Sequence, residues 1–474
     1  MNRSVNRSAN RPPSGPLTLA SSVAGAVVVA LDGTILTIAQ PTLQRDLDAS
    51  FAQVQWTTTG YLIAVAALLV FAGRLGDRYG HRRLFGLGML GFGATSAGIA
   101  LAPGIGWVIA LRVAQGVFGA LLQPATLGML RAAYAPDRLR TPLAVRTAAI
   151  GVAAAAGPVL GGALVTELGW RSVFLLHVVP ALLFGLLALA ARNPEPPRTA
   201  VRLDLPGALL LALALAALVH ALAALSESAG AGPAAPGLTV AAVAGAAFVR
   251  RERRAASPLL PARVVGSAAI GSALGMLVTA SAALHGALFI CVYLLQDTFG
   301  LDPLQTALRS LPLALLMIAA APVSAVLLRR AGARRTTTAA ALVLAAGIAV
   351  LSAASGTISL CAGFALVGAG FGTVMVAATH VVVRHAPVES AGVAGGLQQT
   401  ALNLGPVLGV ATATLLAELG SLRTPLPVLA AVAALGALLG GALPGRAGTK
   451  GTKGAEGSTG THVTTGPERR AARR

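Results

Sequence analysis

The sequence predicts an all-α, polytopic membrane protein with 14 transmembrane helices, arranged as two parallel six-helix repeats plus an inserted helix pair. Of its 474 residues, 55% are apolar and only 11% are charged, and the mean hydropathy is +0.76. A soluble domain carries about 25% charged residues, so this chain has too few ionic groups to cover a surface that faces water. Apolar runs and an internal repeat supply the rest of the prediction.

Apolar runs give the number of helices. A bilayer core of about 30 Å is crossed by about 20 apolar residues of helix. Such runs occur at residues 17–38, 56–73, 84–102, 107–129, 142–165, 172–191, 205–225, 237–249, 267–293, 304–328, 336–353, 357–379, 391–417 and 424–443.

The runs divide the chain into five parts, and no connection is long enough for a soluble domain. We expect an N-terminal tail (1–16), a six-helix bundle (17–191), two inserted helices with basic linkers (192–265), a second six-helix bundle (266–443) and a C-terminal tail (444–474). The last part is rich in Gly, Thr and Arg, which predicts disorder.

Basic residues orient the helices. With the N-terminus inside, the inner segments hold 30 of the 36 Lys and Arg residues, and the outer ones hold only Arg45, Arg171, Arg309 and Arg423. Cytoplasmic loops carry an excess of Lys and Arg, so both termini are predicted to be cytoplasmic and the protein to lie in the cell membrane. The net charge of +20 is spread over short loops, which argues against a nucleic-acid partner.

Two segments recur at nearly equal spacing. The pattern R-x-G-x-R-R occurs at 78–83 and again at 330–335, an offset of 252, and Gly-Pro-Val-Leu-Gly occurs at 157–161 and at 405–409, an offset of 248. The offset pairs the first six helices with the last six in the same orientation. Parallel repeats of this kind are one architecture of secondary transporters, which bind substrate between the repeats near the bilayer midplane.

Asp32 is the only one of 16 acidic residues that lies well inside an apolar run. A carboxylate in hydrocarbon either takes up a proton or meets a cation. We therefore interpret Asp32 as the proton-coupling residue, which predicts about one proton per cycle and neutral or singly charged substrates. The alternative is a structural partner for Arg112 or for a hydroxyl group.

Arg112 lies five residues into its apolar run and is expected to face a cavity or a partner. The alternative is that its long side chain reaches the outer headgroups.

Five motifs, in order along the whole chain, resemble those of the major facilitator superfamily and of its fourteen-helix drug:proton antiporters. They are L-D-x-T-x4-A-x-P (31–41), G-x3-D-R-x-G-x-R-R (73–83), R-x-x-Q-G (112–116), G-P-x-x-G-G (157–162) and D-x-x-G (204–207). The resemblance implies a proton-coupled transporter that works by alternating access, with Arg112 transferring a proton or setting the proton affinity of a carboxylate.

The resemblance also implies two conformational elements. The first is a gating loop that holds the halves together in one state, formed by Gly73, Asp77, Arg78, Gly80, Arg82 and Arg83. The alternative for the three arginines is ordinary positive-inside charge. The second is a pivot formed by Gly157, Pro158, Gly161 and Gly162, whose small residues let helix backbones approach and whose proline adds a kink. The alternative is plain helix packing.

Uncharged polar residues within the apolar runs are candidates for lining a substrate cavity. They are Gln115, His285, Gln398, Gln399 and Asn403, for which packing between helices is an equal alternative. His177 stands where the family often has asparagine, and like most histidines in apolar runs it is expected to be a packing residue.

The sequence contains no nucleotide-binding loop and no catalytic constellation, so we expect neither an enzyme nor a cofactor or metal. The function predicted is export of an apolar or weakly cationic small molecule in exchange for protons, by a monomer in the lipid bilayer. Aromatic residues make up only 4% of the chain, which leaves few rings for cationic drugs. A narrow-specificity metabolite exporter is therefore an alternative, ahead of a uniporter, a channel or a membrane-embedded enzyme.

Overall fold

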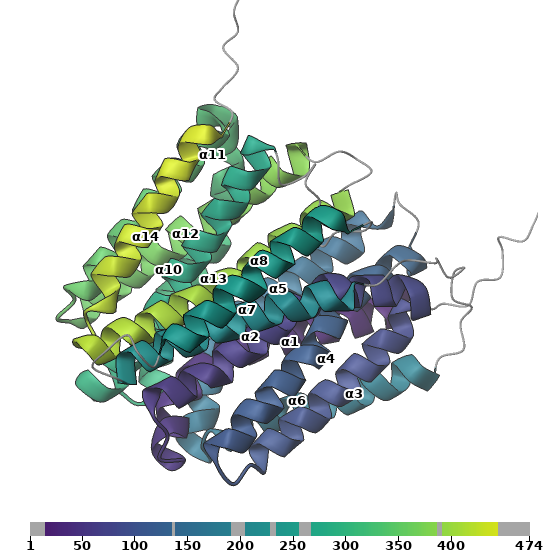
Figure 1. Ribbon diagram of the computed structural model, residues 1–474, viewed down its shortest axis with the longest axis horizontal. Helices are drawn as coiled ribbons and strands as arrows, with labels where there is room; N and C mark the ends of the chain where they lie inside the picture. Colours follow the sequence, from purple (N-terminus) through teal and green to yellow (C-terminus); the bar gives the residue numbers. More distant parts are fainter. Residues whose placement is uncertain are drawn as a thin grey trace, which may run out of the picture.

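The computed structural model is a bundle of long helices packed side by side (Figure 1). It describes residues 15–134, 138–190, 204–227, 234–255, 267–385 and 391–443, which form helices and turns without a β-strand. The two expected tails lie outside these residues, except for residues 15 and 16. The helices are α1 (Gly15–Asp46), α2 (Phe51–Tyr79), α3 (His81–Ala100), α4 (Ile105–Ala133), α5 (Arg140–Leu168), α6 (Arg171–Ala190), α7 (Leu205–Glu227), α8 (Ala235–Arg254), α10 (Ala268–Tyr293), the π-helix η2 (Leu294–Thr298), α11 (Pro303–Ser352), α12 (Thr357–His385), α13 (Ala391–Leu419), α14 (Pro425–Leu439) and the short 3₁₀-helix η4 (Gly440–Ala442).

Nine helices in the described part of the chain are long and apolar enough to cross a bilayer, and two shorter apolar helices lie at Leu205–Ala221 and Pro425–Leu439. The expected spans 304–328 and 336–353 both lie in α11, which consists of two helices separated by a kink at Gly332, where φ 79° and ψ 167° are not helical. Helix α8 carries Arg251, Arg253 and Arg254 in its last turn. The count of 14 spans therefore stays a prediction.

Apolar side chains cover the outside of the bundle. On α6, Leu175, Val179 and Leu186 are each more than half exposed, although they are large and aliphatic. A water-soluble monomer rarely shows a continuous apolar surface of this kind. The surface therefore suits contact with lipid, as the shortage of charged residues predicts.

Matching helix ends recur along the chain. Ser50 caps α2 by accepting a hydrogen bond from the backbone of Gln53, and Asp302 caps α11 by accepting one from Gln305. Both members of the second pair lie 252 residues after those of the first. The caps supply acceptors for backbone N–H groups that the first helical turn leaves unpaired.

Two arginines make equivalent contacts at the same offset. Arg171 donates to the carbonyl of Ala102 (3.5 Å), and Arg423 donates to the carbonyl of Ala354 (3.1 Å). Each arginine thereby joins the start of one helix to the turn after another. These contacts extend the sequence repeat beyond the two motifs that first indicated it.

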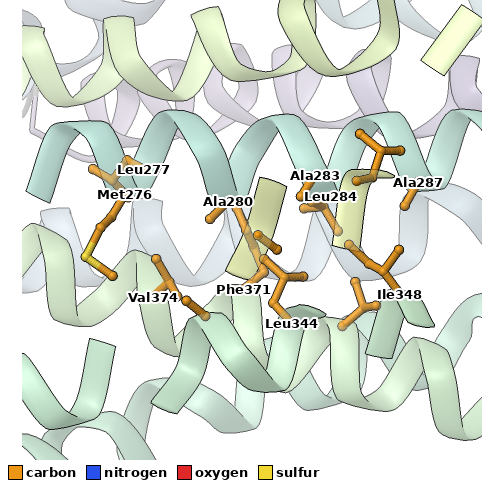
Figure 2. Packing of buried hydrophobic residues seen from close by; sticks show 14 of the residues in the cluster. Met276, Leu277, Ala280, Ala283, Leu284, Ala287, Leu344, Ile348, Phe371 and Val374 are labelled. Atoms are coloured by element: carbon orange, nitrogen blue, oxygen red, sulfur yellow. The ribbon is translucent and has the colours of Figure 1, made fainter. Parts of the chain in front are cut away.

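The core of the second half is formed by α10, α11, α12, α13 and α14. Figure 2 shows aliphatic side chains of α10, among them Ala280 and Leu284, against Leu344 of α11 and Phe371 of α12. All four are at most 5% exposed. Close packing of buried side chains such as these fixes the positions of the helices relative to one another.

The pair α7 and α8 packs against α2 and α13 through α7. Ile63 of α2, Val219 of α7 and Val407 of α13 belong to one buried cluster. At the other end of the pair, Arg251 Nε donates to Asp204 Oδ1 at 2.7 Å, which joins the end of α8 to the residue before α7.

Helices α1 and α2 meet α10 and η2 at one end of the bundle. Gln296 of η2 donates to the carbonyl of Ile38 (3.0 Å), and Arg45 lies 3.6 Å from Asp297. We call these two interactions the η2 contact. Beside it, the ring of Phe51 packs against that of Tyr293, with centroids 4.7 Å apart.

Candidate functional site

Asp32 and Arg112 form a buried ion pair between α1 and α4. Arg112 Nη1 donates to both carboxylate oxygens, at 2.8 Å to Oδ2 and 3.0 Å to Oδ1. Each side chain is 1% exposed. The two residues singled out in the sequence are thus direct partners, and the side chain of Arg112 points into the protein rather than toward headgroups.

The rest of the Arg112 guanidinium is also enclosed. Its Nε donates to the carbonyl of Thr57 at 2.8 Å, and Nη1 contacts Gln115 Oε1. Gln115 in turn donates to Ser96 Oγ at 2.7 Å. On another side the guanidinium lies over the ring of Tyr61, 4.4 Å from the centroid, in a cation–π arrangement.

Protonation of Asp32 would change the balance of charge in this ion pair. Two hydrogen bonds from a guanidinium stabilise a carboxylate ion, and protonation of Asp32 would remove the negative partner of Arg112. A buried cation that loses its partner is strongly destabilised. A proton on Asp32 would therefore favour a rearrangement of α1 and α4.

The sequence-based interpretation missed most of this network. Thr57, Tyr61 and Ser96 were not singled out, although Gln55, Thr57, Thr58, Thr59 and Tyr61 form a polar stretch inside an otherwise apolar helix. Polar side chains at such positions usually line a cavity or meet a buried charge. This polar stretch was the feature of the sequence that could have indicated Thr57 and Tyr61 as residues of the site.

The gating-loop residues surround the turn between α2 and α3. Gly80 has φ 98°, a value that disfavours any residue with a Cβ. His81 Nε2 lies 3.0 Å from Asp77 Oδ1, and the His81 ring fills the space beside Gly76, where a Cβ would overlap it.

The gating-loop side chains differ in their exposure. Asp77, Arg78 and Arg83 are exposed, and Arg82 is half-buried. A Cβ added at Gly73 would lie 3.7 Å from Pro124, an ordinary contact. Space alone therefore does not require glycine at position 73.

The pivot residues bring α5 close to two other helices. A Cβ at Gly157 would overlap Thr34 Oγ1, and one at Gly161 would lie 2.7 Å from Ile35, so both glycines let α5 approach α1. A Cβ at Gly162 would lie 2.8 Å from the Cα of Leu304 on α11. Pro158 lies within α5. The glycine row therefore touches both α1 of the first repeat and α11 of the second.

The same packing recurs in the second repeat. A Cβ at Gly405 would lie 2.5 Å from Ser281 Cβ, and one at Gly409 would overlap the carbonyl of Ala282. Helix α13 thus meets α10 as α5 meets α1, at an offset near 248 residues.

The cavity candidates fall into two groups. Gln115 is fully buried in the Arg112 network and lines no open space. The others lie on α10 and α13: His285 Nδ1 contacts the carbonyl of Ser281 (2.9 Å), and Gln398 donates to Thr379 Oγ1 (2.6 Å). Gln399 is half-buried.

Asn403 is 8% exposed, and its Nδ2 has no hydrogen-bond partner among the described residues. An uncompensated buried amide is costly and indicates a place where another molecule could bind. Within the described ranges, no group of three or more His, Cys, Asp and Glu side chains could hold a metal ion.

A repeated helical bundle with an apolar surface and a buried ion pair has the architecture of a multi-pass membrane transporter. The chain belongs to the Major Facilitator Superfamily, whose family model matches residues 23–410 and 277–472. The resemblance seen in the motifs is thus confirmed.

Similar proteins include bacterial proteins named for drug resistance and export. The chain is 39% identical to the tetracenomycin C resistance and export protein of Streptomyces glaucescens over 402 residues, 83% of this chain and 74% of that protein. It is 35% identical to a puromycin resistance protein of Streptomyces alboniger (82% and 79% covered) and 32% identical to a multidrug efflux pump of Mycolicibacterium smegmatis (81% and 77%).

The fold is also that of a solved structure. A bacterial homologue of the human lysosomal transporter Spinster superimposes with a TM-score of 0.64 at 16% sequence identity, covering 91% of this chain and 97% of that one. At this identity the likeness concerns the fold alone.

Proposed function

We propose that the protein is a proton-coupled antiporter that exports a small molecule across the cell membrane. The observation that carries the proposal is the ion pair between Asp32 and Arg112, in which each side chain is 1% exposed. Such a pair is costly to maintain in an apolar interior and is a weak source of stability, so its presence favours a functional role.

In this mechanism the proton and the substrate use Asp32 in turn. A proton that binds Asp32 separates it from Arg112, and the freed Arg112 keeps Thr57 and Gln115 as neutral acceptors. Loss of the proton restores the pair. Because a single carboxylate takes up the proton, about one proton is exchanged in each transport cycle.

Rocking of the two six-helix halves would carry the site from one side of the membrane to the other. Gly157, Gly161 and Gly162 serve as the pivot, because α5 contacts both α1 and α11 along this row. The gating loop at residues 73–83 holds the inner face in the opposite state. Fourteen spans, two cytoplasmic termini and a monomeric state complete the proposal.

The contacts between α1 and η2 support a conformation closed toward the outside. The η2 contact and the Phe51–Tyr293 pair lie at the end that the distribution of arginines assigns to the outer face. A substrate would then reach the site from the cytoplasm, as an exporter requires.

The substrate proposed is apolar or weakly cationic. The residues expected to line a cavity on α10 and α13 are uncharged, which suits a neutral compound that accepts and donates hydrogen bonds. Similarity to proteins named for tetracenomycin C, puromycin and multidrug efflux favours an antibiotic or related metabolite. The 39% identity to the first of these makes a narrow-specificity metabolite exporter the second candidate.

The proposal is tested in vesicles that contain the purified protein. Accumulation of tetracenomycin C, puromycin and ethidium is measured with and without an imposed pH gradient. Uptake of at least one compound only when the gradient is present supports antiport. Equal flux with and without the gradient would indicate a channel or uniporter, and chemical conversion of a compound would indicate an enzyme.

A further inference from the structure

His285 is a half-buried polar residue in the most buried part of α10. All residues in the range 280–296 are buried except His285 and Leu288, which are half-buried. These two lie three residues apart and therefore share one side of the helix. Four residues further along the same side, Val292 packs in a buried cluster with Ile38 of α1. This side of α10 therefore faces the first half of the protein, and His285 opens into the space between the halves.

The hydrogen bonds of His285 determine which ring nitrogen is free. Its Nδ1 lies 2.9 Å from the carbonyl oxygen of Ser281, which can only accept, so Nδ1 carries a hydrogen atom. The Ser281 hydroxyl, 3.5 Å from Nδ1, gives its own hydrogen to the carbonyl of Leu402 (3.1 Å) and agrees with this assignment. In the neutral ring Nε2 is then an acceptor, and no described residue donates to it.

Aromatic rings close this space at the end where α2 begins. Phe289, one turn after His285, packs against Phe51 of α2 with ring centroids 5.0 Å apart, and the centroid of Tyr293 lies 4.7 Å from that of Phe51. Aromatic residues make up only 4% of the chain, so three rings in mutual contact are a local concentration. Flat ring systems stack favourably on such side chains.

The first half contributes an amide at the same level. Gln55 lies one turn after Phe51 on α2 and is 0% exposed, and neither atom of its amide has a partner among the described residues. Because α2 begins where α10 ends, Gln55 and His285 each lie about 5.4 Å, one helical turn, from the contact of Phe51 with Phe289. Buried polar groups are nearly always hydrogen-bonded, so this amide indicates a place where another molecule binds.

No charge lies on these helix segments. Helix α10 contains no Asp, Glu, Lys or Arg, and α2 contains none before Arg74. The buried charges of Asp32 and Arg112 are paired with each other. Since a charged group is costly to bury without a partner, the ligand that suits this space is uncharged.

We propose that His285 Nε2 accepts a hydrogen bond from the substrate and selects an uncharged aromatic compound that carries a hydroxyl or N–H group. This inference rests on the proposed export function and names the class of its substrate. The ring system of the compound lies beside Phe51 and Phe289, its donor group points at Nε2, and Gln55 pairs with a further polar atom. A methyl ether in place of the hydroxyl keeps the rings but leaves Nε2 without a donor, which lowers affinity.

The test measures binding of two probes, 2-naphthol and its methyl ether 2-methoxynaphthalene, by equilibrium dialysis. The purified protein is held in lipid nanodiscs without a pH gradient, and empty nanodiscs correct for partition of the probes into lipid. The wild type should bind 2-naphthol about three- to tenfold more tightly than the ether, as one hydrogen bond would give.

Three variants separate the acceptor from the rest of the residue. In His285→Leu the two probes should bind equally, because the acceptor is gone. His285→Gln keeps a side-chain oxygen that can accept and should retain part of the preference. His220→Leu changes an exposed histidine of α7 and should retain all of it.

A second readout observes the ring itself. In ¹⁵N-histidine-labelled protein, the resonances absent from His285→Gln should show a protonated Nδ1 and an unprotonated Nε2. The Nε2 resonance should shift when 2-naphthol is added and stay in place when the ether is added.

Several outcomes would overturn the inference. They are failure of both probes to bind, equal binding of both by the wild type, and a preference that persists in His285→Leu. If His285→Leu does not fold, the NMR readout decides, because a protonated Nε2 or an unchanged resonance has the same meaning. If the preference is found but transport in vesicles ignores the gradient, the proposed antiport fails and the binding site remains; the opposite pair of results leaves the antiporter and removes only the role of His285.

Discussion

Arg112, which pairs with Asp32, connects three helices. Its Nη1 donates to both carboxylate oxygens of Asp32 on α1, while its Nε donates to the carbonyl of Thr57 on α2. Arg112 itself lies on α4. Separation of this pair would therefore change the contacts among three helices of the first half, and in the proposed mechanism this is how a proton on Asp32 would affect the rest of the bundle.

The ion pair predicts a coupled effect on stability. Arg112→Leu leaves the Asp32 carboxylate buried without a cation, and loss of one partner from a buried pair costs about 3–5 kcal/mol. Asp32→Asn combined with Arg112→Leu removes both charges and should recover much of that loss. Thermal unfolding in lipid nanodiscs measures both. A double variant no more stable than Arg112→Leu would contradict the pairing.

The glycine row of α5 predicts a difference between two alanine substitutions. Gly157→Ala places a methyl group against Thr34 Oγ1 and should separate α5 from α1, lowering the transport rate by about tenfold or more. Gly151→Ala lies in the same helix with no atom within 4 Å of the added carbon, and should leave transport unchanged.

Thr34→Ala provides the corresponding rescue. It removes the hydroxyl that the new methyl group meets, so it should restore part of the transport lost in Gly157→Ala. Equal activity of Gly157→Ala and Gly151→Ala in the vesicle assay would show that the close approach has no role in transport.

The turn at Gly80 predicts a backbone effect. Its φ of 98° is strained for alanine, and such strain costs about 1–3 kcal/mol. Gly80→Ala should therefore displace the turn between α2 and α3, weaken the contact of His81 with Asp77 and slow transport. Gly106→Ala, where the added carbon has no neighbour within 4 Å, is the control. Cysteine accessibility at position 79 would report the displacement, and an unchanged pattern would argue against it.

The η2 contact predicts which of its two interactions matters. Arg45 and Asp297 have side chains 60% and 42% exposed, and exposed pairs contribute about 0–1 kcal/mol. Asp297→Asn should therefore change little. Gln296→Leu removes a buried hydrogen bond to Ile38 and should shift the protein toward the state open at this end. Labelling of a cysteine at position 55 from outside checks both variants; stronger labelling of Asp297→Asn than of Gln296→Leu would reverse this ranking.

Much of the site could be predicted one residue at a time. Asp32 and Arg112 stood out because each places a charge inside an apolar run, and partnership between them was one of the alternatives left open. The choice could not be made from the sequence, because it depends on the rotation and depth of α1 relative to α4. The rotation and depth of the two helices are set by the packing of the whole bundle, and Asp32 and Arg112 lie 80 positions apart in the sequence.

Other features needed the fold. His177 packs against Phe92 of α3, with ring centroids 5.9 Å apart, and nothing in its own segment predicts this neighbour. The repeat was visible in two motifs, but the equivalent contacts of Arg171 and Arg423 involve backbone carbonyls, which leave no trace in residue types. Gly332 lies in the gap between the expected spans 304–328 and 336–353, but the sharp kink that it makes there, with φ 79° and ψ 167°, is seen only in the structure.

Whether Asp32 exchanges a proton for substrate is decided by Asp32→Asn in vesicles with an imposed pH gradient. Exchange of labelled against unlabelled tetracenomycin C, without a gradient, verifies that the variant is folded and binds substrate, and Asp32→Glu serves as the carboxylate-retaining control. We expect Asp32→Asn to keep exchange but to lose gradient-driven accumulation, whereas Asp32→Glu keeps both. Gradient-driven accumulation by Asp32→Asn at the wild-type level would contradict this expectation.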